Sequence, residues 1–169
     1  MIYKFYSGRN HRFELLAAEV IEYIIKEAGG KYKSGWLTPP AGDQGTDFVG
    51  RLDIGSGFSK TKVVLLGQAK CEKLDSPTGG NHIARTVARL KRGLIGAYVT
   101  TSYFSQNVQE EIIEDQYPII LVNGLILAKT VSEMMIKRGF SKVEDMLSEL
   151  DKSYSENISS RRPEEILFE

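Results

Sequence analysis

Cysteine and histidine are scarce in this chain of 169 residues, which has only Cys71 and two histidines. A single cysteine excludes an intrachain disulfide and fits a reducing cytoplasm, and we interpret Cys71 as a small core residue rather than a reactive thiol. The same scarcity excludes a zinc cluster and a histidine-rich metal site. No apolar run approaches the roughly 20 residues of a membrane span, and residues 1–6 lack the long apolar region of a secretory signal. The sequence therefore indicates a soluble cytoplasmic protein without a membrane partner.

A net charge is also absent, because 22 basic residues balance 22 acidic ones. The two signs are unevenly distributed, since residues 1–104 hold 15 Lys and Arg against 9 Asp and Glu, whereas residues 105–169 hold 7 against 13. The first part thus has a net charge of +6, which permits a local basic surface for nucleic acid on a neutral protein. An ordinary solvated surface with uneven charge is the alternative.

Hydrophobic spacing and turn residues predict alternating helices and strands. Helices are expected over 11–28, 81–92, 105–115, 124–138 and 142–150, and strands over 32–36, 46–52, 62–70, 94–100 and 118–122. Because the later strands alternate with helices, they are expected to pair in parallel. The predicted fold class is α/β, a mixed central β-sheet flanked by helices. A domain over 1–151 would precede a polar linker or tail over 152–169.

The best functional clue is an acid followed, some twenty residues later, by a strand with a polar end. Asp47 comes early in a predicted strand, where aspartate has poor propensity. The apolar strand 62–70 ends in Gln68-Ala69-Lys70, and side-chain alternation points Gln68 and Lys70 to one face. A carboxylate and an amide oxygen can hold a divalent cation, and a lysine can orient a water or stabilise developing charge. The alternatives are a turn aspartate and a solvated lysine at the strand end, although a buried glutamine without a partner would cost a few kcal/mol.

A further carboxylate stands in the helix expected over 11–28. On a helical wheel Glu14 falls between Ile21 and Ile25, inside the apolar sector. Glu14 either lies at the rim, near the positive N-terminal end of the helix dipole, or faces the candidate site. The residues leave both positions open.

Basic residues follow the candidate strand and suggest a contact with DNA. Arg85 and Arg89 are four residues apart on the helix expected over 81–92, so they share one face and can meet the phosphate backbone. His82, just before this basic helix, would contact DNA or cap the helix. Lys73 is a further candidate for the basic surface.

Five short motifs resemble, in their order, those of Mrr-like nucleases, a branch of the PD-(D/E)XK superfamily of restriction endonuclease folds. The motifs are Phe13-Glu14, Gly42-Asp43-Gln44-Gly45-Thr46-Asp47-Phe48, Gln68-Ala69-Lys70, Val99-Thr100-Thr101-Ser102-Tyr103-Phe104-Ser105 and Leu121-Val122-Asn123-Gly124. The resemblance covers about residues 11–130. Glutamine commonly replaces the second acid of the superfamily motif in this branch, which agrees with Gln68. The Gln-Ala-Lys form is also similar to the catalytic domains of modification-dependent restriction enzymes that cut near methylated or hydroxymethylated cytosine.

The resemblance implies a restriction-endonuclease-like fold and Mg²⁺-dependent hydrolysis of DNA phosphodiesters, with Mn²⁺ able to substitute. Asp47 and Gln68 would bind the metal together with the carbonyl of Ala69, Lys70 would position the attacking water, and Glu14 would support the site. Such domains usually cut double-stranded DNA as homodimers or larger assemblies and are often fused to a separate DNA-recognition domain. Two other hypotheses are a structure-specific nuclease such as a junction resolvase and a catalytically silent DNA-binding module.

Overall fold

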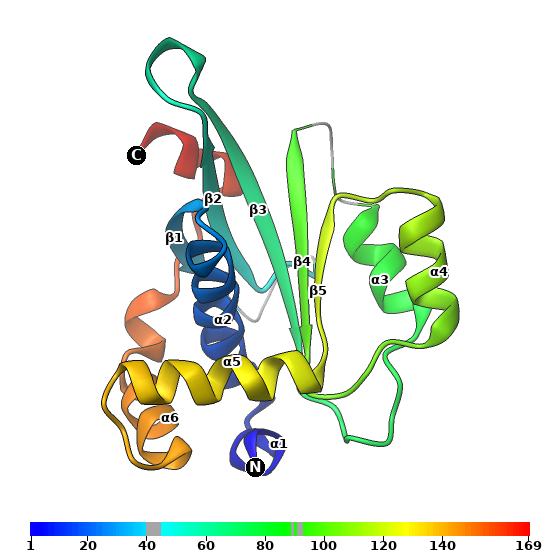
Figure 1. The fold of residues 1–169 in the computed structure, drawn as a ribbon, viewed down its shortest axis with the longest axis vertical. Coiled ribbons are helices and arrows are strands. Elements are labelled where there is room, and N and C mark those ends of the chain that lie inside the picture. The colour runs from blue at the N-terminus through cyan, green and yellow to red at the C-terminus, as the bar shows by residue number, and fades with distance from the viewer. Residues whose placement is uncertain (40–44, 89, 91–92) are drawn as a thin grey trace.

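The computed structural model describes residues 1–39, 45–88, 90 and 93–169, with side chains for all of these except 81, 82 and 85. Five strands form one mixed sheet in sequence order (Figure 1): β1 Lys31–Leu37, β2 Phe48–Ile54, β3 Thr61–Lys70, β4 Leu94–Thr100 and β5 Ile119–Val122. The first three strands pair antiparallel, whereas β3 with β4 and β4 with β5 pair in parallel. The predicted mixed sheet and the parallel pairing of the later strands are confirmed.

Helices cover both faces of this sheet. They are α1 Ile2–Tyr6, α2 Phe13–Glu27, α3 Gly80–Val87, α4 Gln106–Glu114, α5 Gly124–Lys137 and α6 Val143–Lys152, with 3₁₀ turns at Asn10–Arg12, Gly57–Ser59, Tyr154–Asn157 and Pro163–Phe168. The sequence pattern did not predict α1, and α3 is shorter than the helix expected over 81–92. Within the described part of the chain, none of the helices has both the length and the apolar character that crossing a bilayer demands.

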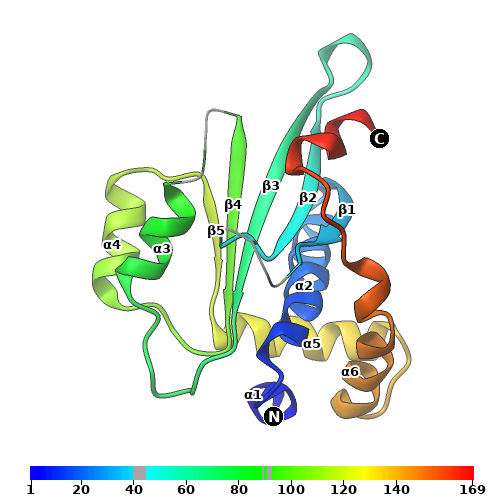
Figure 2. The ribbon, with the colours of Figure 1, turned by 180° about the vertical axis from the view of Figure 1, so that it is seen from behind.

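The hydrophobic core is divided by the sheet. Figure 1 shows α2 and α5 on one face, and Figure 2 shows α3, α4 and the C-terminal 3₁₀ turn on the other. Phe13, Leu16 and Ile21 are completely buried along one side of α2, at the spacing that produces a single apolar helix face. Cys71 belongs to the core on the α2 side, as predicted, and burial raises the pKa of its thiol. The thiol therefore stays protonated and unreactive at neutral pH.

Strand β3 lies in the middle of the molecule, with strands on both sides and helices over both faces. Val64, Leu65 and Leu66 are buried consecutively, which is typical of a strand covered on both faces. Leu65 packs in the α2 core, whereas Val64 and Leu66 pack with Ile166 on the opposite face. This alternation places the even-numbered residues of β3 on the face that α3 also covers.

Two of the motifs that carry the family resemblance have a role in the fold. The Asn123 side-chain oxygen accepts hydrogen bonds from the first turn of α5 and so caps this helix. The Gly124 N–H donates to the Ser102 carbonyl at 2.6 Å. A side chain at Gly124 would stand 2.4 Å from the Thr101 carbonyl oxygen. Only glycine therefore permits this close contact between the end of β5 and the residues after β4.

The segment 152–169, expected as a polar linker or tail, packs back on the sheet. Ile166 is completely buried, and the Arg51 guanidinium donates to its carbonyl at 2.9 Å. Earlier in the segment, Ile158 forms a parallel β-bridge to Leu37. The Leu37 carbonyl accepts a hydrogen bond from the Ser159 N–H at 2.9 Å. The Ile166 contact lies on the face opposite α2, near the C-terminal end shown in Figure 2, whereas Leu37 and Ile158 pack with the core on the α2 side.

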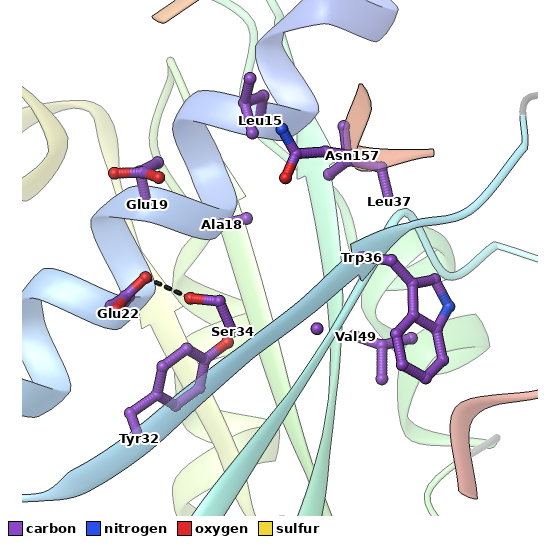
Figure 3. A pocket seen from close by; sticks show the side chains of 11 residues that line it. Leu15, Ala18, Glu19, Glu22, Tyr32, Ser34, Trp36, Leu37, Val49 and Asn157 are labelled. Carbon is purple, nitrogen blue, oxygen red and sulfur yellow. Dashed lines mark hydrogen bonds between the residues drawn. The ribbon is translucent and has the colours of Figure 1, made fainter. Parts of the chain in front are cut away.

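A crevice between α2 and β1 shows a second place where this segment meets the rest of the chain (Figure 3). Asn157 lies there beside Leu15, and the Ser34 hydroxyl donates to the Glu22 carboxylate across the crevice. The segment thus contacts both a helix and the edge strand. The expected domain boundary after residue 151 stays a prediction, and a stability measurement can test it.

Ile166→Ala is expected to lower the free energy of unfolding by about 2–5 kcal/mol, because it leaves a cavity at a fully buried position. Phe168→Ala is the matched control, since Phe168 is 88% exposed and its truncation removes little buried surface. Urea unfolding followed by circular dichroism measures both. Equal midpoints for the two variants would mean that the C-terminal segment is not part of the cooperative folding unit.

Candidate functional site

Asp47 lies immediately before β2, against the C-terminal end of β3. Its backbone N–H donates to the Gly67 carbonyl at 2.8 Å, and its own carbonyl accepts from the Thr38 N–H at 3.0 Å. Asp47 is 8% exposed, and its carboxylate Oδ2 accepts a hydrogen bond from the Ala69 N–H at 2.7 Å. The carboxylate is therefore fixed to the backbone of β3 between Gln68 and Lys70.

Gly67 makes this arrangement possible. A side chain at Gly67 would stand 2.0 Å from the ring of Phe48, which is completely buried and follows Asp47 directly. The absence of a side chain lets the Phe48 ring lie across β3. The packing of this ring then holds the start of β2, and with it Asp47, close to β3.

Gln68 and Lys70 end β3 on the face that α3 covers. In the parallel ladder Gln68 is opposite Tyr98, and Lys70 is opposite Thr100. The Gln68 Oε1 accepts a hydrogen bond from the Thr86 hydroxyl at 2.5 Å, so the half-buried glutamine has a polar partner. Lys70 is half-buried and forms no ion pair with any residue that the structure describes.

The Ala69 carbonyl points to the side of Asp47. The Ala69 N–H donates to Asp47 rather than to β4, and in extended backbone the N–H and C=O of one residue point to the same side. The carbonyl oxygen of Ala69 and the carboxylate of Asp47 therefore face the same space beyond the start of β2. These are two of the three groups that the resemblance assigns to the metal ion, and the Gln68 amide oxygen is the third.

The oxygen donors of this site suit a hard divalent cation. The described residues contain no group of three or more His, Cys, Asp or Glu side chains that could hold a metal ion. The available donors are instead the Asp47 carboxylate, the Gln68 amide oxygen and the Ala69 carbonyl. Carboxylate, amide and carbonyl oxygens are the ligands that Mg²⁺ and Mn²⁺ prefer, and Mg²⁺ completes its shell with water. The donor set therefore fits the expected cofactor.

Glu14 lies in the first turn of α2 and is half-buried. Tyr154, a buried residue of the C-terminal segment, is influenced by the charges of both Glu14 and Asp47. Burial raises the pKa of the Tyr154 phenol, and the Glu14 and Asp47 carboxylates raise it further. The phenol is therefore within electrostatic reach of both carboxylates. The Tyr154 hydroxyl has no hydrogen-bond partner among the described residues, as is also true of the hydroxyl of Tyr98, the residue opposite Gln68 in the ladder.

Three residues near the site were not expected from the sequence. Thr86, Tyr98 and Tyr154 are all buried, and each lies in an element far from Gln68 along the chain. A threonine within a basic helix and a tyrosine within a polar segment were the only signals. Neither indicates a role without knowledge of which strand the element covers.

The charge asymmetry of the chain is partly neutralised in space. Arg9 and Arg12 each place a guanidinium nitrogen 3.0 Å from the same Asp151 carboxylate oxygen, and the Lys33 ammonium lies 3.0 Å from the Glu169 carboxylate. Each pair joins the basic first part of the chain to the acidic second part. These three cations are therefore not the basic surface that the charge count suggested.

The residues expected to contact DNA are only partly described. Lys73 is exposed in the loop after β3 and forms no ion pair with described residues. His82 and Arg85 lie in α3, which covers the Gln68 face of the sheet, but their side chains are outside the described atoms. Arg89 lies outside the described residues altogether. The roles of all four stay predictions.

Comparison with known proteins connects this geometry to a family. Residues 7–131 match the family model Mrr_cat, described as restriction endonuclease. No curated protein matches the chain significantly. A solved structure of MspJI restriction endonuclease in complex with a 27-mer oligonucleotide superposes with a TM-score of 0.94 and 46% identity, over 99% of this chain and 38% of that chain. The DNA modification-dependent restriction endonuclease AspBHI superposes with a TM-score of 0.73 and 25% identity, over 90% of this chain and 38% of that one. The chain thus spans 38% of the length of each of these proteins.

Proposed function

The chain belongs to the Mrr_cat family of restriction endonucleases, and on this premise we propose that it hydrolyses phosphodiester bonds of double-stranded DNA with Mg²⁺ as cofactor. We further propose that it is the cleavage domain of a modification-dependent restriction enzyme. The observation that carries the proposal is the hydrogen bond from the Ala69 N–H to the Asp47 carboxylate. This bond holds the acid beside the strand that ends in Gln68 and Lys70.

Asp47, Gln68 and the Ala69 carbonyl would hold the cation. When bound, Mg²⁺ would offset charge on the scissile phosphate and lower the pKa of a coordinated water. The Asp47 carboxylate, kept in place by β3, contributes the one negative charge of this ligand set. Mn²⁺ would fill the same site, because it takes the same oxygen ligands.

Lys70 would act on the attacking water and the phosphate. Its ammonium group can orient the water by a hydrogen bond and stabilise the negative charge that develops on the phosphate oxygens. Since Lys70 forms no ion pair with the residues that the structure describes, none of these would have to be released before it serves the substrate. Glu14 would support the site from the start of α2 as a further carboxylate that anchors water.

We propose that Lys73, His82, Arg85 and Arg89 contact the DNA backbone beside this site. Lys73→Ala and Arg85→Ala, measured singly, are expected to weaken binding to all duplexes alike. Each loss should flatten the dependence of log Kd on log salt concentration by roughly one unit. Binding is measured with Ca²⁺ in place of Mg²⁺, on the expectation that Ca²⁺ does not support cleavage.

Lys31→Ala is the control for these binding measurements. Lys31 is exposed at the start of β1, opposite Asp53 and next to the β2–β3 hairpin, so it lies at the other end of the sheet from Asp47. This variant loses one positive charge and should keep the parental salt slope. If Lys73→Ala and Arg85→Ala behave like Lys31→Ala, the DNA lies on another surface.

Two active sites can cut both strands of a duplex at once, so we propose that the active species is a homodimer or a larger assembly on DNA. A separate DNA-recognition domain, fused or associated, would supply the choice of sequence. The rate of double-strand cleavage should then rise more steeply than linearly with protein concentration. A strictly linear dependence would indicate that one copy cuts the two strands in turn.

The deciding experiment incubates methylated and unmethylated plasmid with the protein in Mg²⁺, in Mn²⁺ and in excess chelator. Cleavage is expected with either metal and none with the chelator. Cleavage that persists in chelator would remove the metal from the proposal. A four-way junction is incubated in parallel: cleavage confined to it would instead support a resolvase, and binding without any cleavage would support a silent DNA-binding module. Equal cleavage of both plasmids would place the recognition of modified bases outside these residues.

A further inference from the structure

Thr86 is the described residue of α3 that reaches the end of β3. It is 4% exposed, and its hydroxyl donates to the Gln68 Oε1 at 2.5 Å. Thr86 also lines a small hollow together with Gly45, Thr46 and Gly67, which directly precede Asp47 and Gln68. Thr86 therefore lies beside the residues that directly precede the two proposed metal ligands Asp47 and Gln68. Thr86 is neither one of the proposed metal ligands nor a group proposed to act on the water or the phosphate.

A glutamine that binds a metal must hold its side-chain amide in one of two orientations, whereas a carboxylate can bind in either. A carboxylate offers two equivalent oxygens, so either orientation of the group presents a ligand to the cation. The amide of Gln68 has one oxygen and one NH₂ group, and the NH₂ group would repel a cation. A hydroxyl donor fixed beside the amide favours the orientation in which the oxygen faces it. The second lone pair of that oxygen stays available for a metal.

On these grounds we propose that Thr86 is a positioning residue that orients the Gln68 amide for metal binding. The inference rests on the proposed function, because it assigns Thr86 to the same metal site. It explains why an uncharged ligand can serve in place of an acid: the protein provides the orientation that the amide lacks by itself. Outer partners of this kind typically change metal affinity by about 10–100-fold when they are removed.

The test is a double-mutant cycle read out by Mn²⁺ binding to the full chain without DNA. Thr86→Val keeps the size of the side chain and removes the hydroxyl, and it is expected to weaken Mn²⁺ binding by about 10–100-fold in isothermal titration calorimetry. Thr86→Ser restores the hydroxyl and should return the affinity close to that of the parent. In a Gln68→Glu background Thr86→Val should have a much smaller effect, because a carboxylate needs no such orientation.

The outcomes separate this inference from the proposed function. A parent protein that binds no Mn²⁺ and does not cleave DNA would overturn both. If the parent binds Mn²⁺ and Thr86→Val binds it equally well, only the role of Thr86 is overturned. Equal losses of affinity in the Gln68 and Gln68→Glu backgrounds, or no rescue by Thr86→Ser, would assign Thr86 a purely structural role and also overturn the inference. Urea unfolding of each variant shows whether the compared proteins are folded.

Discussion

Lys70→Met is expected to lower the rate of DNA cleavage by about 10²–10³-fold, the usual cost of removing one group that stabilises charge in a transition state. Methionine keeps the length and the apolar stem of the side chain, and no ion pair with described residues is lost. The free energy of unfolding should therefore change little. Single-turnover cleavage of supercoiled plasmid measures the rate, and urea unfolding measures the stability.

Lys62→Met provides the matched control on the same strand and the same face. Lys62 lies at the hairpin end of β3, where its ammonium donates to the backbone carbonyls of Leu167 and Glu169 at 2.8 and 3.1 Å. This variant should lose some stability and keep the cleavage rate, the reverse of Lys70→Met. A Lys70→Met protein that cleaves at the parental rate would remove this lysine from the mechanism.

Local sequence signals predicted the central strands of the sheet well, but not the long-range contact that completes the candidate site. Apolar runs bounded by glycine and polar turns are local features, so the expected strands 62–70 and 94–100 agree closely with β3 and β4. The alternation of side chains along one strand also predicted that Gln68 and Lys70 point to the same face of the sheet. The hydrogen bond between Asp47 and Ala69 joins residues 22 positions apart, and only the antiparallel register of β2 and β3 brings them together.

The parts that sequence reasoning did not predict depend on contacts distant along the chain. The short 3₁₀ turns at 154–157 and 163–168 give no helical periodicity. Tyr154 and Ile158 are isolated apolar residues in a polar segment, and Ile166 begins a run of only three apolar residues. Each is accommodated by a surface that the sheet and α2 have already formed. Thr86 likewise acquires its contact with Gln68 because α3 crosses the same face of the sheet. Such residues become visible only when the packing of whole elements is known.

Charge counts along the sequence were the least reliable guide to the surface. The basic first part of the chain contributes Arg9, Arg12 and Lys33 to ion pairs with acids of the second part. Arg51 and Lys60 also share the Asp53 carboxylate within the first part, and these contacts lower the pKa of Asp53 to about 2. The basic surface proposed for DNA therefore depends on the few cations around Lys70, such as Lys73, rather than on the total.

The Asp47 carboxylate has two roles that different substitutions can separate. Asp47→Asn keeps an oxygen that can accept the Ala69 N–H bond, but it removes the only negative charge of the proposed ligand set. Asp47→Ala removes the charge and also leaves the Ala69 N–H without its acceptor, which costs about 1–3 kcal/mol if that group stays buried. The two variants should therefore lose cleavage alike and differ in the free energy of unfolding.

Asp47→Asn is expected to lower the cleavage rate by orders of magnitude at any Mg²⁺ concentration, with a fold close to that of the parent, because a neutral amide cannot replace the charge that holds the cation. Cleavage over a titration of Mg²⁺ and of Mn²⁺ measures the rate, and Mn²⁺ titration calorimetry without DNA measures the affinity. Asp75→Asn is the control, since this acid lies in the loop after β3, outside the proposed ligand set. Parental cleavage and Mn²⁺ affinity in Asp47→Asn would show that the cation is held elsewhere, and the hydrogen bond to Ala69 would then be only a contact that joins β2 to β3.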